Sequence, residues 1–128
     1  MANELRVDVV YVSRSGHHVA RLLGDISRDT VFPEYCDGLM FAERFMQAVK
    51  DVDAPRALDI SGCTVRDDSF FGLVGYAHRL FGGHRLPLIC KQGEEDKINT
   101  ARMNSLVDCY RSADDIPTSS QSGQTAQA

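Results

Sequence analysis

The sequence predicts a single α/β domain in which three helices pack against a mixed sheet of four or five strands. Two observations predict this class. Segments typical of strands alternate along the chain with segments whose apolar residues recur at helical spacing, an order that places helices against a partly parallel sheet. The chain also has 128 residues, of which 43% are hydrophobic and 25% charged, the size and composition of one globular domain.

A β-hairpin is the first predicted element. Residues 7–12 are rich in β-branched side chains, and after the turn Ser-Arg-Ser-Gly a second apolar run occupies residues 18–23. The stretch from Gly24 to Gly38 is mostly polar and carries only scattered apolar side chains. We therefore predict a long loop there.

The middle of the chain predicts a helix, a strand and a second helix. Residues 39–52 lack Gly and Pro and repeat apolar side chains at helical intervals. Residues 56–65 begin with the apolar and polar alternation of a strand, and Ser61-Gly62 marks where this strand leaves the sheet. Residues 69–81 carry a helical apolar stripe, follow two aspartates suited to capping, and end at Gly82-Gly83.

The last predicted elements are a strand, a weaker helix and a closing strand. Residues 86–90 are apolar, and Pro87 predicts that this strand lies at an edge or begins there, because proline cannot donate a ladder hydrogen bond. A helix is predicted over 97–106 and a short strand over 109–111. Residues 117–128 are rich in Ser and Gln without large apolar side chains, which predicts a disordered tail after a domain of residues 1–116.

Composition and charge narrow the class of partner. Fourteen Lys and Arg against eighteen Asp and Glu give a net charge of −4 without a basic block, so nucleic acid is not expected as a direct partner. No apolar run approaches the length of a membrane span, and the N-terminus has no secretory signal pattern, so we expect a cytoplasmic protein that does not insert into membranes. The four cysteines form no Cys-x-x-Cys pair, so no metal site is expected.

A family resemblance is carried by residues 57–73, which read ALDISGCTVRDDSFFGL. This segment resembles the central signature of STAS domains, the family of anti-sigma factor antagonists and transporter regulatory domains. In that family a strand Leu-Asp-Leu-Ser-Gly leads into Asp-Ser-Ser-Gly-Leu-Gly, which opens the second helix. Gly24-Asp25, Gly82-Gly83 and the closing segment 107–115 are similar to further family positions, so the resemblance covers roughly residues 5–116 and implies a STAS-like fold.

The resemblance also implies a function. Ser69 matches the serine that is phosphorylated in antagonists of this family, and it would lie at a helix N-terminus, where an anion is favoured. The unphosphorylated antagonist binds a kinase-like anti-sigma factor and so releases the sigma factor, while the serine kinase reverses this step. The implied protein is a bacterial phosphoprotein of partner switching, with no enzymatic activity and no cofactor of its own. Its implied partner-binding residues are Asp25, Asp67, Asp68, Ser69 and Phe70.

This sequence departs from the family pattern at the helix-opening motif. Asp68-Ser69-Phe70 stands where the family has Ser-Ser-Gly, and the stretch between Gly24 and Leu39 is longer than is usual. Asp68 brings a permanent negative charge beside Ser69. Phe70 also belongs to the apolar stripe of its helix, which predicts a place in the core.

Alternative functions stay open at this point. Asp67, Asp68 and Ser69 can simply cap a helix, and a STAS domain can instead regulate an anion transporter or a lipid-transport complex. Asp59 superficially resembles the phosphorylated aspartate of receiver domains, but the acidic pair that would hold magnesium is missing after the first strand. A small thiol or histidine enzyme would draw on the cysteines and histidines of the chain, namely Cys36, Cys63, Cys90, Cys109, His17, His18, His78 and His84.

Overall fold

The chain folds as an α/β domain, as the sequence predicts, with more elements than expected. The computed structural model describes residues 4–31, 41–52 and 56–117, and within these ranges it has six strands and four α-helices instead of four or five strands and three helices. In chain order the elements are β1 (Arg6–Val12), β2 (His17–Ile26), α1 (Arg28–Val31), α2 (Phe41–Val49), β3 (Arg56–Asp59), β4 (Cys63–Val65), α3 (Ser69–Leu80), β5 (Leu86–Ile89), α4 (Gln92–Thr100), β6 (Val107–Tyr110) and a 3-10 turn, η1 (Ala113–Asp115).

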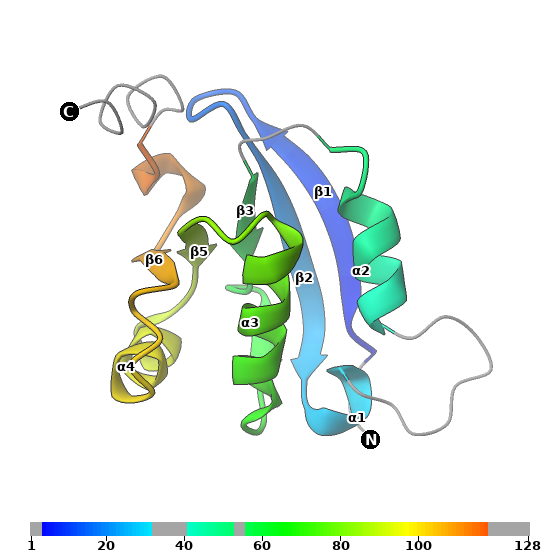
Figure 1. Cartoon of the computed structure of the whole chain (residues 1–128), viewed down its shortest axis with the longest axis vertical. Helices are drawn as coiled ribbons and strands as arrows, with labels where there is room; N and C mark the ends of the chain where they lie inside the picture. The colour runs from blue at the N-terminus through cyan, green and yellow to red at the C-terminus, as the bar shows by residue number, and fades with distance from the viewer. Residues whose placement is uncertain (1–3, 32–40, 53–55, 118–128) are drawn as a thin grey trace.

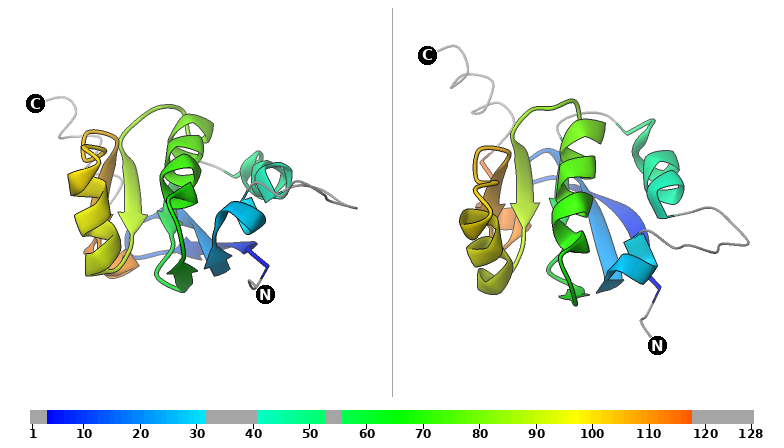
Figure 2. Two further views of the ribbon diagram at one scale, coloured as in Figure 1. Left: turned by 90° about the horizontal axis from the view of Figure 1, so that it is seen from below. Right: turned by 60° about the horizontal axis from the view of Figure 1, so that its bottom comes forward.

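All six strands belong to one mixed sheet (Figure 1). Its order is β1-β2-β3-β5-β6; β1 runs antiparallel to β2, and the other neighbours are parallel. The helices lie on one side of this sheet (Figure 2). That arrangement follows from three successive crossovers in one direction, because right-handed parallel connections place their helices on the same face.

The predicted strand over 56–65 is two strands. β3 pairs with the first half of β2, and β4 pairs with its last three residues. A tight turn between them interrupts the strand. There the Asp59 carboxylate accepts hydrogen bonds from Ser61 N at 2.8 Å and from Ser61 Oγ at 2.6 Å. An Asx-type turn of this kind interrupts the ladder while β2 continues unbroken beside it.

Pro87 lies in β5, which is an interior strand, so the edge alternative is wrong; the other alternative is close, because β5 begins at Leu86, one residue earlier. Leu86 and Cys90 each donate a backbone hydrogen bond of 2.9 Å to the β6 segment. Because backbone groups alternate along a strand, the nitrogen of Pro87 faces β3. β3 pairs with β5 only from Leu88 onward. The missing N–H therefore falls where the ladder has not yet begun.

The other predicted boundaries are partly confirmed. The hairpin forms as predicted, with Val12 paired to His17 at its closed end. The predicted loop begins instead with the end of β2 and with α1, and its residues 32–38 lie outside the described residues. The third predicted helix, 97–106, spans Gln92–Thr100 instead. It starts earlier because the Glu94 side chain accepts from Lys91 N at 3.3 Å and caps the helix there, and it ends before Arg102, whose φ of 59° is left-handed. Residues 118–128, in the predicted tail, are also outside the described residues.

The main core lies between the sheet and the helices. Phe45 of α2 is at its centre, with its ring centroid 5.6 Å from that of Phe41, 6.1 Å from Tyr76 and 5.9 Å from Phe81. These contacts join α2 to α3. A second, smaller cluster covers part of the opposite face of the sheet, where Ile116, which follows η1, packs against side chains of β2, β3 and β5.

Candidate functional site

The strand-turn-helix segment places Ser69 at the first residue of α3. The Asp67 carboxylate caps this helix: its Oδ1 accepts from Ser69 N at 2.9 Å and from Ser69 Oγ at 2.5 Å. Of the two aspartates that the sequence offers as caps, Asp67 therefore fills the role. Within the described chain, the Asp68 side chain makes no capping hydrogen bond. Asp67 and Asp68 are exposed, and Ser69 is half-buried.

The same carboxylate also holds a second helix. Asp67 Oδ2 accepts from the backbone N–H of Arg28 at 2.9 Å, and Arg28 is the first residue of α1. Nearby, Arg66 N donates to Ile26 O at 2.9 Å, so the segment after β4 stays beside the end of β2. One exposed carboxylate thus joins the N-termini of two helices, through a hydrogen bond between residues 39 positions apart in sequence.

These hydrogen bonds lower the pKa of Asp67. The hydroxyl of Ser69 is the main cause, followed by the backbone N–H groups of Arg28 and Ser69, because each donor stabilises the ionised carboxylate. A carboxylate whose pKa is lowered by folding contributes stability above its ordinary pKa, and this contribution is lost as the pH falls through the lowered value. The tether between α1 and α3 is therefore intact at neutral pH and weakens only under strong acid.

We expect Ser69→Ala to raise the pKa of Asp67 toward its ordinary value. The substitution removes the hydroxyl that contributes most to the lowered pKa and leaves both backbone donors in place. The pKa can be followed by NMR titration of the Asp67 carboxyl carbon in both proteins. As a control, the backbone amide signals of β1 should be the same in the two proteins, since β1 lies outside this network. An unchanged Asp67 curve in the variant would show that the Ser69 hydroxyl does not bond the carboxylate.

Asp25 lies beneath this surface and is not part of it. Its side chain is only 3% exposed and accepts from Arg66 Nε at 2.8 Å, while the Arg66 side chain is 54% exposed. The Asp25 backbone carbonyl also accepts from the Thr30 hydroxyl at 2.7 Å, beside α1. The implied role of Asp25 as a partner-contacting residue is therefore replaced by a positioning one: it orients the arginine that immediately precedes Asp67.

Phe70 also lies away from the exposed surface. Its side chain is 0% exposed and belongs to the main core, where its ring centroid is 5.3 Å from that of Phe71. The apolar stripe predicted this position, whereas the role that the resemblance implied, contact with a partner, needs an exposed ring. The exposed part of the candidate site is therefore Asp67, Asp68 and Ser69, with Arg66 beside them.

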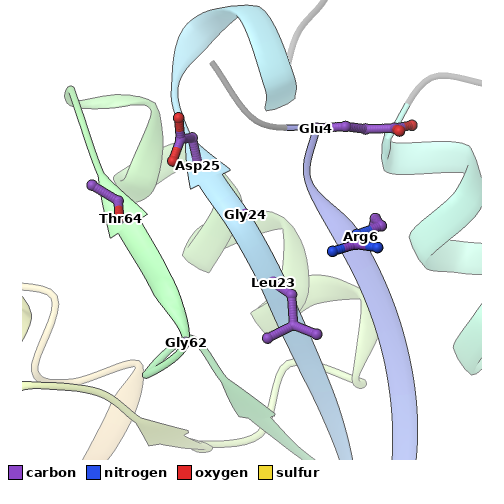
Figure 3. Close-up of a pocket in the computed structure, with 7 residues that line it drawn as sticks. All are labelled: Glu4, Arg6, Leu23, Gly24, Asp25, Gly62 and Thr64. Atoms are coloured by element: carbon purple, nitrogen blue, oxygen red, sulfur yellow. The ribbon is translucent and has the colours of Figure 1, made fainter. Parts of the chain in front are cut away.

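A polar depression lies on the sheet next to Asp25 (Figure 3). Its volume is about 540 Å³, and it is lined by Glu4, Arg6, Leu23, Gly24, Asp25, Gly62 and Thr64. The Asp25 carboxylate is engaged by Arg66, and Glu4 lies 3.7 Å from Arg44. The charged groups at this depression thus include two carboxylates that already contact arginines.

The described cysteines are poor candidates for a nucleophile. Burial raises the pKa of the Cys63 and Cys90 thiols to about 12 and also raises that of Cys109. Thiols of this kind are protonated at neutral pH and react slowly. Cys36 lies outside the described residues. Asp59, the residue of the receiver interpretation, has one carboxylate oxygen engaged by Ser61.

Sequence reasoning located Ser69 and missed two of the groups around it. The Arg28 amide and the Arg66 guanidinium reach the site from residues that carry no motif. The only sequence signals were the position of Arg66 directly before the two aspartates and the Gly24-Asp25 pair of the resemblance. Neither signal predicts that Arg66 contacts Asp25 or that the Arg28 amide contacts Asp67.

The sequence matches no protein-family model and no curated protein. Among the described residues, no group of three or more His, Cys, Asp or Glu side chains is arranged to hold a metal ion. No helix in the same ranges has the length and apolar character needed to cross a bilayer.

Proposed function

We propose that this chain is a protein-binding module of the STAS type whose contact surface surrounds the N-terminus of α3 and is switched by phosphorylation of Ser69. The observation that carries the proposal is the shared Asp67 carboxylate, which bonds the Ser69 hydroxyl, the Ser69 amide and the Arg28 amide together. A chemical change at the Ser69 hydroxyl therefore alters a carboxylate that is hydrogen-bonded to the N-termini of both α1 and α3.

Phosphorylation would act on this network directly. A partner kinase transfers the γ-phosphoryl group of ATP to Ser69 Oγ, which loses its proton, and ADP leaves. The hydroxyl donor to Asp67 disappears, and a group with about −1.5 to −2 charges arrives beside the carboxylate. Repulsion between the two anions weakens the bond to the Arg28 amide, and the half-exposed Arg66 is the nearest cation in sequence. Compared with the unmodified surface, the phosphorylated surface carries more negative charge and holds α1 less tightly.

The resemblance to STAS domains supplies the class of partner. We propose an anti-sigma factor with a serine kinase activity, which binds the unmodified surface and later phosphorylates Ser69. In this cycle the chain regulates transcription through its partner without contacting nucleic acid or catalysing a reaction itself. The exposed Asp67 and Asp68 favour basic side chains on the facing surface of that partner.

Binding by the wild type, Ser69→Ala and Ser69→Asp tests the proposal. Each protein is used as bait in a lysate of the source organism, retained proteins are identified by mass spectrometry, and affinity for the purified kinase is then measured. We expect the wild type and Ser69→Ala to retain a kinase-like ATPase. Ser69→Asp should weaken binding by on the order of 1–3 kcal/mol, the range of a few charge-assisted contacts.

A matched control distinguishes an effect of the Ser69 position from an effect of added negative charge elsewhere on the surface. Ser105 is exposed and lies just before β6, at the amino end of the parallel strands, whereas α3 begins near their carboxyl end. Ser105→Asp adds the same charge and should bind as the wild type does. Equal binding by all four proteins would leave an interaction module without a switch at Ser69, and retention of no kinase by any of them would contradict the proposed partner.

A further inference from the structure

Three side chains form a row across the sheet at the end opposite to Ser69. Tyr11 of β1 is paired in register with His18 of β2, and His18 is paired with Arg56 of β3. Side chains alternate between the two faces of a strand, so His18 and Arg56 share the face of the buried Ala20 and Leu58. The row therefore lies on the face that carries the helices, at the end where the hairpin closes (Figure 1).

Two nitrogens in this row are buried without a hydrogen-bond partner. His18 Nδ1 and Arg56 Nε are the buried side-chain polar atoms of the described residues for which the structure provides none. Buried polar groups in proteins are normally paired, so two unpaired nitrogens on adjacent strands call for an acceptor between or beside them. Arg56 Nε carries a hydrogen, and Nδ1 carries one in the appropriate tautomer or when the imidazole is protonated.

Among the described residues, no carboxylate forms an ion pair with Arg56. Its guanidinium lies over the Phe81 ring, with Cζ 5.2 Å from the centroid. That contact covers one face of the guanidinium, and Nε has no hydrogen-bond partner among the described residues. Within the described ranges, the carboxylates that form ion pairs do so with other arginines, Arg44, Arg66, Arg85 and Arg111.

The row opens to solvent at Tyr11. The Tyr11 side chain is 58% exposed, and its ring centroid is 4.9 Å from that of His18. Tyr11 thus forms an aromatic wall at the outer end of the row, while the phenol hydroxyl adds another hydrogen-bonding group. Tyr11 lies on β1, one of the two edge strands on the main path of the sheet, so this end of the row faces solvent.

We propose that Tyr11, His18 and Arg56 form a binding site for a phosphate group. The guanidinium and the imidazole supply hydrogen-bond donors from neighbouring strands. A phosphate offers several acceptor oxygens and a negative charge that would pair with the Arg56 guanidinium. Free phosphate and a phosphomonoester share this chemistry. The site lies at the other end of the sheet from Ser69, and its function does not depend on the switch proposed there.

NMR titration of the full chain with sodium orthophosphate tests the site, at constant ionic strength maintained with sodium chloride. We expect the Arg56 Nε–H signal and the His18 ring signals to shift and saturate along one binding curve. Shifts that grow linearly without saturation, or that are equal at all arginines, would overturn the proposal. This measurement on the wild type stands even where a variant fails to fold.

Two matched variants locate the binding. Arg56→Gln should raise the dissociation constant for phosphate at least about tenfold, because a charge-assisted contact of this kind contributes that much. Arg21→Gln makes the same change on β2, at an exposed position on the opposite face of the sheet, and should leave the constant unchanged. Equal loss in both variants would indicate general charge attraction and overturn the site.

A second ligand identifies the source of the phosphate. Phenyl phosphate carries the same group on an aromatic ring that can stack on Tyr11. Tighter binding than orthophosphate, lost in Tyr11→Ala, would support the site and assign it to an aromatic phosphomonoester. Equal affinities would support it as a site for the free ion. Ser69→Ala should bind phosphate as the wild type does, so failure of this proposal and failure of the switch are distinguishable.

Discussion

Gly24→Ala is expected to destabilise the domain by about 3 kcal/mol, a large part of the roughly 5–15 kcal/mol typical of a small domain. Gly24 has φ of +117°, a conformation that residues with a Cβ rarely adopt. A Cβ at this position would lie 2.2 Å from the Glu4 carbonyl oxygen and 3.3 Å from Leu5 Cα. Both neighbours are backbone atoms, so relief requires the segment before β1 to leave β2.

Gly75→Ala is the matched control for this substitution. Gly75 lies within α3, and a Cβ there would meet nothing within 4 Å. Alanine favours helices over glycine by roughly 0.5–1 kcal/mol, so the control should be slightly more stable than the wild type. Urea unfolding followed by circular dichroism measures both. A loss below about 1 kcal/mol for Gly24→Ala would mean that residues before β1 adjust freely, contrary to the close approach.

Phe45→Ala is expected to cost about 3–5 kcal/mol, the usual range for removing a fully buried phenylalanine. The side chain is 0% exposed and contacts rings on both α2 and α3. Its loss leaves a cavity between these helices and removes the ring contact with Phe81, which itself lies beneath Arg56. We therefore expect lower stability together with weaker order at the C-terminal end of α3.

Met46→Ala, at the next residue of α2, controls for the effect of truncation on the helix. The Met46 side chain is 43% exposed, so its removal should cost less than about 1 kcal/mol. Urea unfolding gives both free energies, and hydrogen exchange reports the end of α3. Similar losses for the two variants would show that Phe45 contributes no more than an exposed residue of the same helix, and would contradict the central place of its ring.

Local sequence patterns predicted the parts of the fold that depend on local interactions. The hairpin and α3 were predicted close to their observed bounds, because strong apolar periodicity and nearby turn residues define both. The exit from the sheet at Ser61-Gly62 was predicted, but the return of the chain to β2 as β4 was missed, because it depends on a side-chain turn at Asp59 and on how far β2 extends beside it. The edge alternative for the strand of Pro87 was wrong because the position where the β3 ladder begins is a property of the assembled sheet.

In the candidate site, too, only the features that depend on local sequence could be predicted. That Ser69 begins a helix was visible from the aspartates before it and the stripe after it. The tether from Asp67 to Arg28 was not predictable, because α1 has four residues and is held by side-chain contacts more than by an apolar pattern. Burial of Asp25 likewise depends on Arg66 folding back from a segment 41 residues later.

The long strand β2 gives the folding reaction a definite order. Its ladder with β1 closes a short hairpin, which forms quickly because the loop to be closed is small. Its other edge pairs with β3 and β4, which follow α1 and α2 in the chain. A hairpin that has not paired with β3 and β4 exposes a long row of unpaired N–H and C=O groups along β2, a feature that recruits strands from other chains. Slow docking of the segment from β3 to β4 would therefore be the step at which this protein is most prone to aggregate during synthesis or refolding.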